Sequence, residues 1–351
     1  PTTNDRVPQV YVTESKVLNL DPADPLWVGR KAPEGQPTGI THRHTLKMDW
    51  SHGHNTTIHN GISRIGAYTG GHAARFRDED LADKWVEKSV EWIEANQDNP
   101  FFLFFASHDL HVPRIAHERF QGASDLGPRG DTIVQLDWCV GQITKTLDRL
   151  GLSENTLIVF CSDNGPVMDD GYKDLALEMV GSHRAGGPFT GGKYSVYEGG
   201  TRTPFIAWWP GKIAPGVSDE IVSTMDLGAS FAAMVGQDIS DTALPDSFDL
   251  SGALLGKPDA EGRDYIVQQD NGRTGNLGLR EGYWKLVRHP GNRARNTMVE
   301  EKLANTQVPT IGLYNLKADP GELHNLVDQH PEVAQRLEAR LDDILAAKRT
   351  R

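Results

Sequence analysis

The stretch of residues 157–166, Leu-Ile-Val-Phe-Cys-Ser-Asp-Asn-Gly-Pro, constrains the fold of this chain more than any other. Its apolar run lacks the alternation of a half-buried strand and predicts a buried strand of a parallel sheet at 157–161. The run stops at Asp163 and Asn164. Ligands of open α/β sheets bind at the carboxyl ends of strands, and carboxylate and amide oxygens suit a hard divalent cation. The same two residues also favour a simple Asx turn, so both interpretations stay open at this point.

Helical and strand-like patterns alternate around this stretch. Apolar residues recur at helical spacing from Leu81 to Ile93 and from Ile133 to Leu150, and Asp226 is placed to cap a third helix. Apolar runs at 101–106 and 205–209 read as further strands. This alternation predicts the α/β class, with a mixed, mostly parallel sheet flanked by helices.

The pattern changes after residue 258. Apolar stretches predict short antiparallel strands at 265–267, 277–287 and 313–314, and Pro331 opens a helix with one apolar face. We therefore expect two domains, an α/β domain over residues 1–258 and a smaller α+β domain over residues 259–351. Residues 1–75 show weak periodicity, with a hairpin expected across Thr13-Glu14-Ser15.

A polar, Gly-rich loop follows residue 165 and ends at 191–204 as Gly-Gly-Lys-Tyr-Ser-Val-Tyr-Glu-Gly-Gly-Thr-Arg-Thr-Pro. Lys193, just after two glycines, can reach an anion as a compact point charge. A solvated lysine in a flexible loop is the alternative. Asp169 and Asp170 lie earlier in the loop. Binding of sugar hydroxyls is one interpretation of these residues, and a solvated acidic loop is the favoured one.

Several motifs in this order resemble type I sulfatases of the arylsulfatase kind, in the alkaline phosphatase superfamily. They are Ser-Asp-Asn-Gly-Pro at 162–166, Gly-Gly-Lys at 191–193, Tyr-Glu-Gly-Gly-Thr-Arg-Thr-Pro at 197–204 and Trp-Pro-Gly at 209–211. Upstream, residues 101–113 resemble the family's apolar strand followed by His-X-Pro, and residues 312–326 resemble its C-terminal ending. The resemblance implies a sulfuric ester hydrolase.

The resemblance also implies roles for single residues. Asp163 and Asn164 become metal ligands, with Ca²⁺ as the expected ion and Mg²⁺ as the alternative. Lys193 and His111 contact the sulfate and its bridging oxygen, and one of them protonates the leaving group. His183 is a weaker candidate for substrate contact. His108, three residues before His111, is expected to pack or to support the site from outside.

One departure from the family matters more than the matches. The family's nucleophile is a formylglycine made from Cys or Ser in a Cys-X-Pro-Ser-Arg motif, and neither Cys139 nor Cys161 lies in such a motif. The resemblance therefore implies that the chain corresponds to the C-terminal part of a sulfatase, with the formylglycine upstream. We expect the isolated chain to be inactive, and the missing N-terminal half or a homo-oligomer to be its protein partner.

Composition excludes other classes. The net charge of −12 argues against a nucleic-acid surface, which would be basic. No run approaches the about 18 apolar residues of a membrane span. Two cysteines give no disulfide framework, and core packing is expected for both. The expected substrate is a sulfated small molecule or carbohydrate, and the family suggests a periplasmic, secreted or lysosome-like location.

Two other functions remain open from the sequence. A phosphomonoester or phosphonate hydrolase of the alkaline phosphatase superfamily would share the metal at the strand end. A non-catalytic binder of sulfated glycans would need no nucleophile. A group of histidines near residues 42–59 suggests a zinc site, but its spacing fits no structural zinc pattern. Polar loop chemistry is the favoured interpretation.

Overall fold

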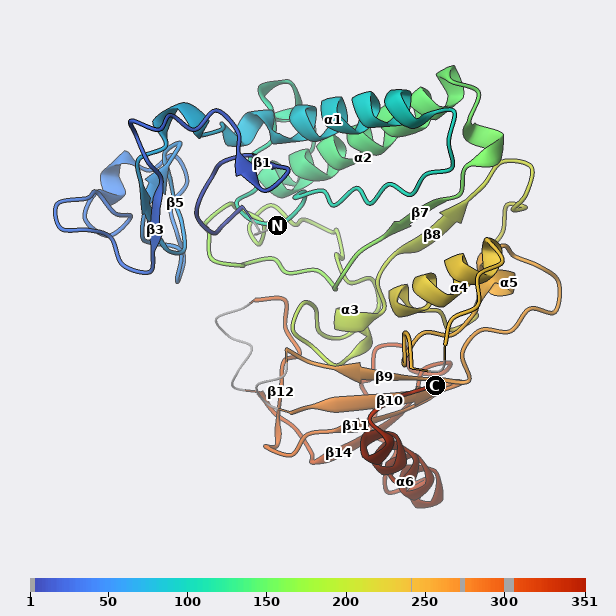
Figure 1. Ribbon diagram of the computed structural model, residues 1–351. Coiled ribbons are helices and arrows are strands. Elements are labelled where there is room, and N and C mark those ends of the chain that lie inside the picture. Colours follow the sequence, from blue (N-terminus) through green and yellow to red (C-terminus); the bar gives the residue numbers. More distant parts are fainter. Residues whose placement is uncertain (1–3, 241, 272–274, 300–305) are drawn as a thin grey trace. The chain divides into compact units, whose positions relative to one another are not determined.

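The computed structural model describes residues 4–240, 242–271, 275–299 and 306–351, which form two compact units (Figure 1). The first unit comprises Pro1–Leu152 and Met168–His183. The second comprises Ser153–Val167 and Arg184–Arg351. The expected division of the sequence at 258/259 stays a prediction.

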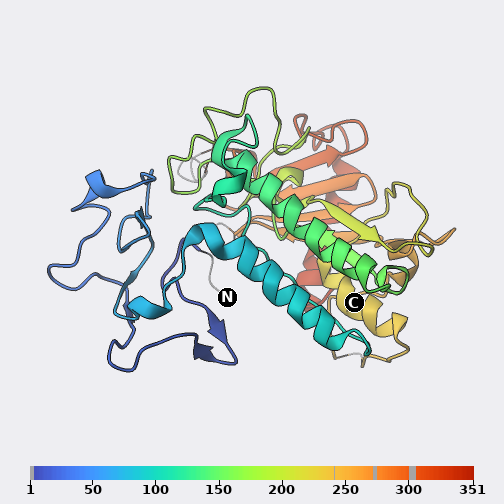
Figure 2. The same ribbon diagram turned by 90° about the horizontal axis from the view of Figure 1, so that it is seen from above.

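Two long helices lie side by side in the first unit (Figure 2). They are α1 (Leu81–Asn96) and α2 (Gly127–Arg149), and both were predicted. Ala82 and Val86 of α1 pack against Cys139 of α2 in a small apolar cluster. Cys139 is therefore a core residue, as expected. No helix within the described ranges combines the length and the apolar character that crossing a membrane requires.

The rest of the first unit is built from very short antiparallel strand pairs. The pairs are β1 (Val12–Thr13) with β2 (Lys16–Val17), β3 (Trp27–Gly29) with β6 (Ala67–Thr69), and β4 (Ile58–His59) with β5 (Ile62–Ser63). The expected hairpin before residue 18 is confirmed, with Glu14 and Ser15 in left-handed conformation at its turn. Short 3₁₀ turns connect these pairs at Arg43–Thr45, His72–Ala74, Asp78–Asp80 and Glu118–Phe120.

The strand before Asp163 differs from the prediction. It is β7 (Ile158–Cys161), and it pairs antiparallel with β8 (Phe205–Trp208), placing Ile158 opposite Trp208. All strand pairs in the described ranges are antiparallel, so the expected mostly parallel sheet is wrong for this part of the chain. Ile158, Val159 and Phe160 are only half-buried, so the expected burial of this strand is also wrong. An apolar run does not specify the neighbouring strand or its direction, which the chain path between the strands decides.

Two further expectations fail beside these strands. Cys161, at the end of β7, is exposed rather than packed in a core. Residues 101–106 form no strand in the described structure, although their side chains alternate between half-buried and exposed positions as strand residues do. Assignment as a strand requires a hydrogen-bonded neighbour, which a sequence pattern cannot supply by itself.

The C-terminal part of the second unit matches its prediction closely. Four antiparallel strands lie in the order β14 (Ile311–Asn315), β11 (Trp284–Arg288), β10 (Leu277–Glu281) and β9 (Tyr265–Gln269). Helix α6 (Pro331–Ala347) packs its apolar face on one side of this sheet, through a core of Leu279, Leu286, Leu313, Ala334, Leu337 and Leu341. We call these four strands the C-terminal sheet.

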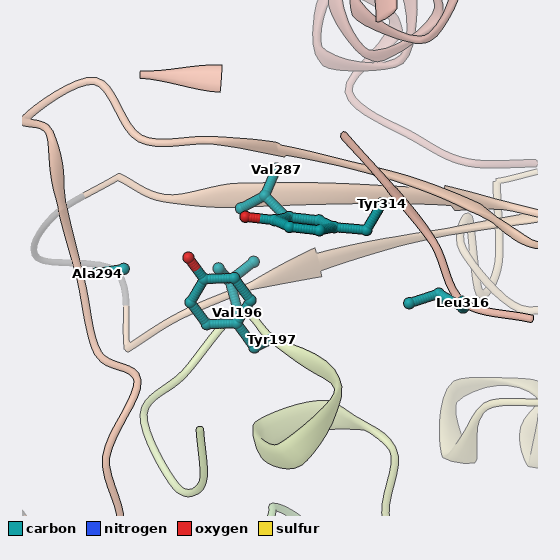
Figure 3. Packing of buried hydrophobic residues seen from close by; sticks show 6 residues of the cluster. All are labelled: Val196, Tyr197, Val287, Ala294, Tyr314 and Leu316. Carbon is teal, nitrogen blue, oxygen red and sulfur yellow. The ribbon is translucent and has the colours of Figure 1, made fainter. Parts of the chain in front are cut away.

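The other face of the C-terminal sheet is also covered. Val196 and Tyr197 pack on Val287 of β11 and Tyr314 of β14, with the two tyrosine rings edge to face (Figure 3). Tyr197 directly precedes the short helix α3 (Glu198–Thr201), which belongs to the Gly-rich loop of the sequence motifs. The segment that contains Lys193 therefore rests on this sheet.

The remaining elements of the second unit are short. They are α4 (Leu227–Met234), α5 (Ser251–Leu254), the pair β12 (Arg293–Ala294) and β13 (Thr306–Gln307), and 3₁₀ turns at Ser153–Asn155 and Thr224–Asp226. Asp226 is the N-cap of α4, as predicted, and it also completes a capping box with Ser223 over the preceding turn.

Candidate functional site

Asp163 and Asn164 follow the end of β7 in the second unit. The Asp163 side chain is exposed, and no described residue forms an ion pair or a hydrogen bond with its carboxylate. The Asn164 amide donates from Nδ2 to the carbonyl of Gly165 at 2.9 Å, and its Oδ1 is the acceptor end of the same amide. Two side-chain oxygens are therefore presented at the end of one strand.

Backbone contacts fix this strand end. The hydroxyl of Ser162 donates to the Asn164 carbonyl at 3.0 Å, and the hydroxyl of Thr203 donates to the Ser162 carbonyl at 3.1 Å. Thr203 lies two residues before β8, so the segment that enters β8 contacts the end of β7. These two hydroxyl contacts hold the backbone that carries Asp163 and Asn164.

These oxygens fit a hard divalent cation in kind but not in number. Ca²⁺ takes about six to eight oxygen ligands, and Asp163 with Asn164 supplies two. No cluster of three or more His, Cys, Asp or Glu side chains with metal-binding geometry occurs in the described ranges. The two residues therefore form part of a cation site, and their role as ligands stays a prediction.

Lys193 lies beside this turn within the same unit. Its backbone N–H donates to the Pro166 carbonyl, and the Gly165 N–H donates to the Gly200 carbonyl, both at 2.9 Å. A Cβ atom on Gly165 would lie 1.8 Å from the carbonyl oxygen of Gly199, so only glycine fits there. This close approach holds the segment of Lys193 next to Asp163 and Asn164.

His111 belongs to the first unit. Its Nδ1 lies 2.9 Å from the Val112 carbonyl oxygen, and because a carbonyl only accepts, Nδ1 carries a proton. The other nitrogen, Nε2, faces the buried carboxylate of Asp170 at 3.8 Å. Val112 is buried against Ile62 and Tyr172, which anchors the histidine through its neighbour. The ring is half-buried, and its Nε2 is the atom suited to proton exchange.

A buried ion pair ties the His111 segment to the following loop. Arg114 Nη1 lies 2.7 Å from Asp174 Oδ2 and donates to the Met168 carbonyl at 3.1 Å, while Nε donates to the Leu110 carbonyl at 3.2 Å. Burial raises the pKa of Asp174, and Arg114 opposes this effect. The pair fixes the loop that carries Asp170 against the segment that carries His111.

Sequence reasoning missed Asp170. The structure buries it, whereas the sequence predicted a solvated acidic loop. Its neighbours in sequence give no periodic signal, because the loop acquires its inward face from tertiary contacts such as Trp50 with Tyr172. The ion pair of Arg114 with Asp174 brings the loop of Asp170 beside the segment of His111, and no residue pattern indicates this contact.

His108 and His183 take different positions in the same unit. His108 Nε2 lies 3.2 Å from Asp109 Oδ1, and burial raises the pKa of Asp109, which also accepts a hydrogen bond from Gln135. His183 is exposed, and its Nε2 lies 3.5 Å from Nη1 of Arg129. Burial lowers the pKa of Arg129 to about 10. A substrate contact by His183 stays a prediction.

The histidines of residues 42–59 make ordinary polar contacts where they are buried. His54 Nε2 lies 3.2 Å from Asp5 Oδ2. His59 joins the Tyr68 hydroxyl at 2.7 Å and the Phe76 carbonyl at 2.8 Å, and burial lowers its pKa. These contacts agree with the interpretation as polar loop chemistry.

The structure thus brings together some of the expected site residues. Asp163, Asn164 and Lys193 lie close to one another within the second unit. His111 and His183 belong to the first unit, where His111 faces Asp170 and His183 faces Arg129.

Comparisons with known proteins agree with the resemblance. The model of the Sulfatase family matches residues 27–237. An N-acetylgalactosamine-6-O-sulfatase of Bacteroides thetaiotaomicron is 45% identical over 345 residues, which cover 98% of this chain and 66% of that protein. Human arylsulfatase A is 36% identical over 255 residues, covering 69% of this chain and 48% of that protein.

A solved structure extends the likeness to the fold. A Bacteroides thetaiotaomicron protein, solved in work on the metabolism of multiple glycosaminoglycans, superposes with a TM-score of 0.90 at 43% identity. The match covers 97% of this chain and 70% of that one. The sequence relatives are longer, and the chain spans about two thirds of the bacterial relative and about half of the human one. The sulfatase α/β fold and the family match agree, and the chain belongs to the sulfatase family.

Proposed function

We propose that the protein containing this chain hydrolyses a sulfate ester. The observation that carries the proposal is the interlocked turn of the second unit, where Asp163 and Asn164 present oxygens beside the segment of Lys193. Sulfate ester cleavage requires charge neutralisation on the sulfuryl oxygens, and a lysine together with a divalent cation would supply it.

The proposed substrate is a 6-O-sulfated N-acetylgalactosamine unit of a glycosaminoglycan. The support is the bacterial relative named N-acetylgalactosamine-6-O-sulfatase, which matches almost the whole chain. A likeness in sequence does not decide the sulfate position, so the experiment below compares 6-O- and 4-O-sulfated sugars.

The likeness to sulfatases assigns a separate task to each candidate residue. When bound, Ca²⁺ would act as a Lewis acid on the sulfate, with Asp163 and Asn164 among its ligands. Lys193 would neutralise developing charge as a point charge. His111 would move a proton at Nε2, because Nδ1 is committed to the Val112 carbonyl. No catalytic step is assigned to Cys139 or Cys161, since neither lies in a nucleophile motif.

The inactivity of the isolated chain remains a prediction. So does the alternative of phosphate monoester or phosphonate hydrolysis, and so does non-catalytic binding of sulfated glycans. One assay distinguishes these alternatives. It measures sulfate release, phosphate release and binding without turnover on the same preparations.

The test uses the full-length protein and measures sulfate released from 6-O-sulfated and 4-O-sulfated N-acetylgalactosamine, together with Ca²⁺ binding by calorimetry. Asp163→Ala should weaken both calcium binding and rate, because a charged ligand is lost. Lys193→Ala should lower the rate roughly a hundredfold or more while calcium binding stays near the parent value. His111→Ala should behave like Lys193→Ala, with a larger loss on substrates whose leaving group is a poor one.

Lys212→Ala is the matched control, because Lys212 is an exposed lysine of the same unit that follows β8. It should leave both measurements unchanged. Parent-like calcium binding and rate in Asp163→Ala would show that Asp163 only closes a turn. Phosphate release at a higher rate than sulfate release would favour the phosphatase, and tight binding without any turnover would favour the glycan binder.

A further inference from the structure

A buried charge cluster joins the Lys193 segment to the C-terminal sheet. Lys285 Nζ lies 2.9 Å from Glu198 Oε1 and 3.0 Å from Glu322 Oε1. All three side chains are fully buried, and Arg280 Nη1 adds a fourth charge 3.3 Å from Glu198 Oε2. The partly exposed Arg202 also reaches the cluster, with its Nη1 3.8 Å from Glu198 Oε2.

The strand pattern places these cations under the loop. Lys285 lies between Trp284 and Leu286 on β11, so it faces away from the α6 side that Leu286 faces. Arg280 is its cross-strand partner on β10. The face of the C-terminal sheet opposite α6 is thus charged in the middle and apolar beside it, where Val287 and Tyr314 meet Tyr197 (Figure 3).

Glu322 and Glu198 have different tasks in this cluster. Glu322 Oε2 accepts a hydrogen bond from the Glu198 backbone N–H at 2.6 Å, at the first residue of α3. Burial raises the pKa of Glu322, and Lys285 only partly offsets it. Burial would also raise the pKa of Glu198, but Lys285 and Arg280 outweigh it and hold that pKa below its usual value. Glu322 therefore caps the start of α3, and Glu198 is the carboxylate that both Lys285 and Arg280 contact.

The cluster is connected to the candidate site by a short chain of contacts. The Gly199 N–H donates to the Thr190 carbonyl and the Gly165 N–H donates to the Gly200 carbonyl, each at 2.9 Å. A Cβ atom on Gly199 would lie 2.4 Å from the Thr190 carbonyl oxygen, and one on Gly200 would lie 2.3 Å from the Ser195 carbonyl oxygen. Packing this tight passes a shift of α3 directly to Gly165 and to the turn that holds Asn164.

We propose that Glu198, Lys285 and Glu322 are positioning residues for the hydrolytic site, which they hold in register with the C-terminal sheet. The inference rests on the proposed sulfate ester hydrolysis for its kinetic consequence. The structural part of the inference, that the cluster fixes the backbone at Gly165 and Lys193, does not depend on the proposed reaction. The C-terminal sheet thereby gains a role in catalysis through geometry, although none of its residues contacts the site turn itself through the described hydrogen bonds.

The experiment compares the full-length protein with Lys285→Met, which removes the one cation that contacts both buried carboxylates and leaves Glu198 with Arg280 and the partly exposed Arg202. Amide hydrogen exchange at Gly165 and Lys193 reports the two backbone contacts directly. We expect exchange at both amides to accelerate about tenfold or more. We expect kcat to fall roughly ten- to a hundredfold with little change in KM, since small displacements of catalytic groups affect the transition state most.

The double variant Lys285→Met/Glu322→Gln supplies the rescue. It restores charge balance between Glu198 and Arg280, and its glutamine oxygen can still accept the Glu198 N–H. Slow exchange and most of the rate should return. If Lys285→Met does not fold, Glu322→Gln alone is measured in the same way, because it unbalances the cluster while keeping the hydrogen bond.

Asp226→Asn is the matched control. It breaks another buried pair of the second unit, Asp226 with Arg263 at 2.6 Å, which does not contact the glycine loop. If amide exchange at Gly165 and Lys193 accelerates equally in this control and in Lys285→Met, the cluster contributes only to general stability and the inference is overturned. Absence of sulfate release by the parent would defeat the proposed function alone, because the exchange measurement still decides the positioning role.

Discussion

The first unit and the C-terminal sheet differ in the kind of side chain that they bury. In the first unit the interior around β4 and β5 contains charges, with Arg64 and Asp78 both fully buried and joined by two hydrogen bonds of 2.7 and 2.8 Å. In the C-terminal sheet, the side that faces α6 is built of leucines. Regular strands bury apolar side chains efficiently, whereas two-residue strands leave backbone groups that polar side chains must satisfy.

Contacts around Arg64 show how the polar interior is satisfied. Arg64 also donates to the Asn4 carbonyl, Asn4 donates to Asp78 at 2.6 Å, and Asn60 donates to Asp78 at 3.1 Å. Buried charges of this kind hold a unique arrangement but are costly when one partner is removed. We therefore expect the first unit to lose stability sharply when a charge is lost, and the α6 face of the C-terminal sheet to lose stability in proportion to the side-chain volume removed.

The largest effect should follow Asp78→Ala in the first unit. The change leaves the guanidinium of Arg64 buried without its carboxylate, which costs roughly 3–5 kcal/mol. Native-state hydrogen exchange, read at amides of the first unit and of the C-terminal sheet separately, measures the loss where it occurs. An equal loss in the C-terminal sheet would show that the two regions unfold together and would break the comparison.

A smaller loss, about 3 kcal/mol, should follow Leu337→Ala in α6. Leu337 is fully buried among leucines of β10, β11 and β14, and its truncation leaves a cavity that a regular sheet cannot close completely. Chemical denaturation gives the free energy of unfolding. Leu345→Ala, at an exposed position of the same helix, is the control and should change it little.

The smallest effect concerns acid. Burial alone would raise the pKa of Asp78, but Arg64 and hydrogen bonds from Asn4 and Asn60 hold it below its usual value. The carboxylate therefore stabilises the fold above the ordinary aspartate pKa, and this stabilisation is lost as pH falls through the lower, folded-state value.

One proton changes the free energy of unfolding by at most about 1.4 kcal/mol per pH unit. Unfolding of the parent followed between pH 6 and pH 2 should therefore show a slope in the first unit that is reduced in Asp78→Asn. A slope that persists unchanged in the variant would assign the acid sensitivity to other carboxylates.

Elements with a periodic residue pattern could be predicted from the sequence. The two long helices, the hairpin near residue 14, the four strands of the C-terminal sheet and α6 all follow repeats of 3.6 or 2 residues and local turn signals. The turn at Asp163 was accessible for the same reason, because an apolar run that ends in Asp-Asn-Gly-Pro marks a strand end whatever its partner.

Strand pairing and the burial of isolated polar residues could not be predicted from the sequence. The antiparallel pairing of β7 with β8, the exposed Cys161 and the buried Asp170 depend on which segments meet in space. Glu198 has a local ion-pair partner four residues along the chain in Arg202, whose Nη1 lies 3.8 Å from Glu198 Oε2. The closer partner is Lys285, which no local pattern connects to it.

The sequence by itself determined the family, the C-terminal sheet with its helix, and the order of the polar motifs, because periodicity and turn chemistry act over a few residues. Only the tertiary structure decided that Lys285 lies under Glu198, 87 residues away in sequence, and that Gly165 fits against Gly199 and Gly200. Contacts over such separations depend on the path of the whole chain, and the energy of a buried charge depends on everything that surrounds it.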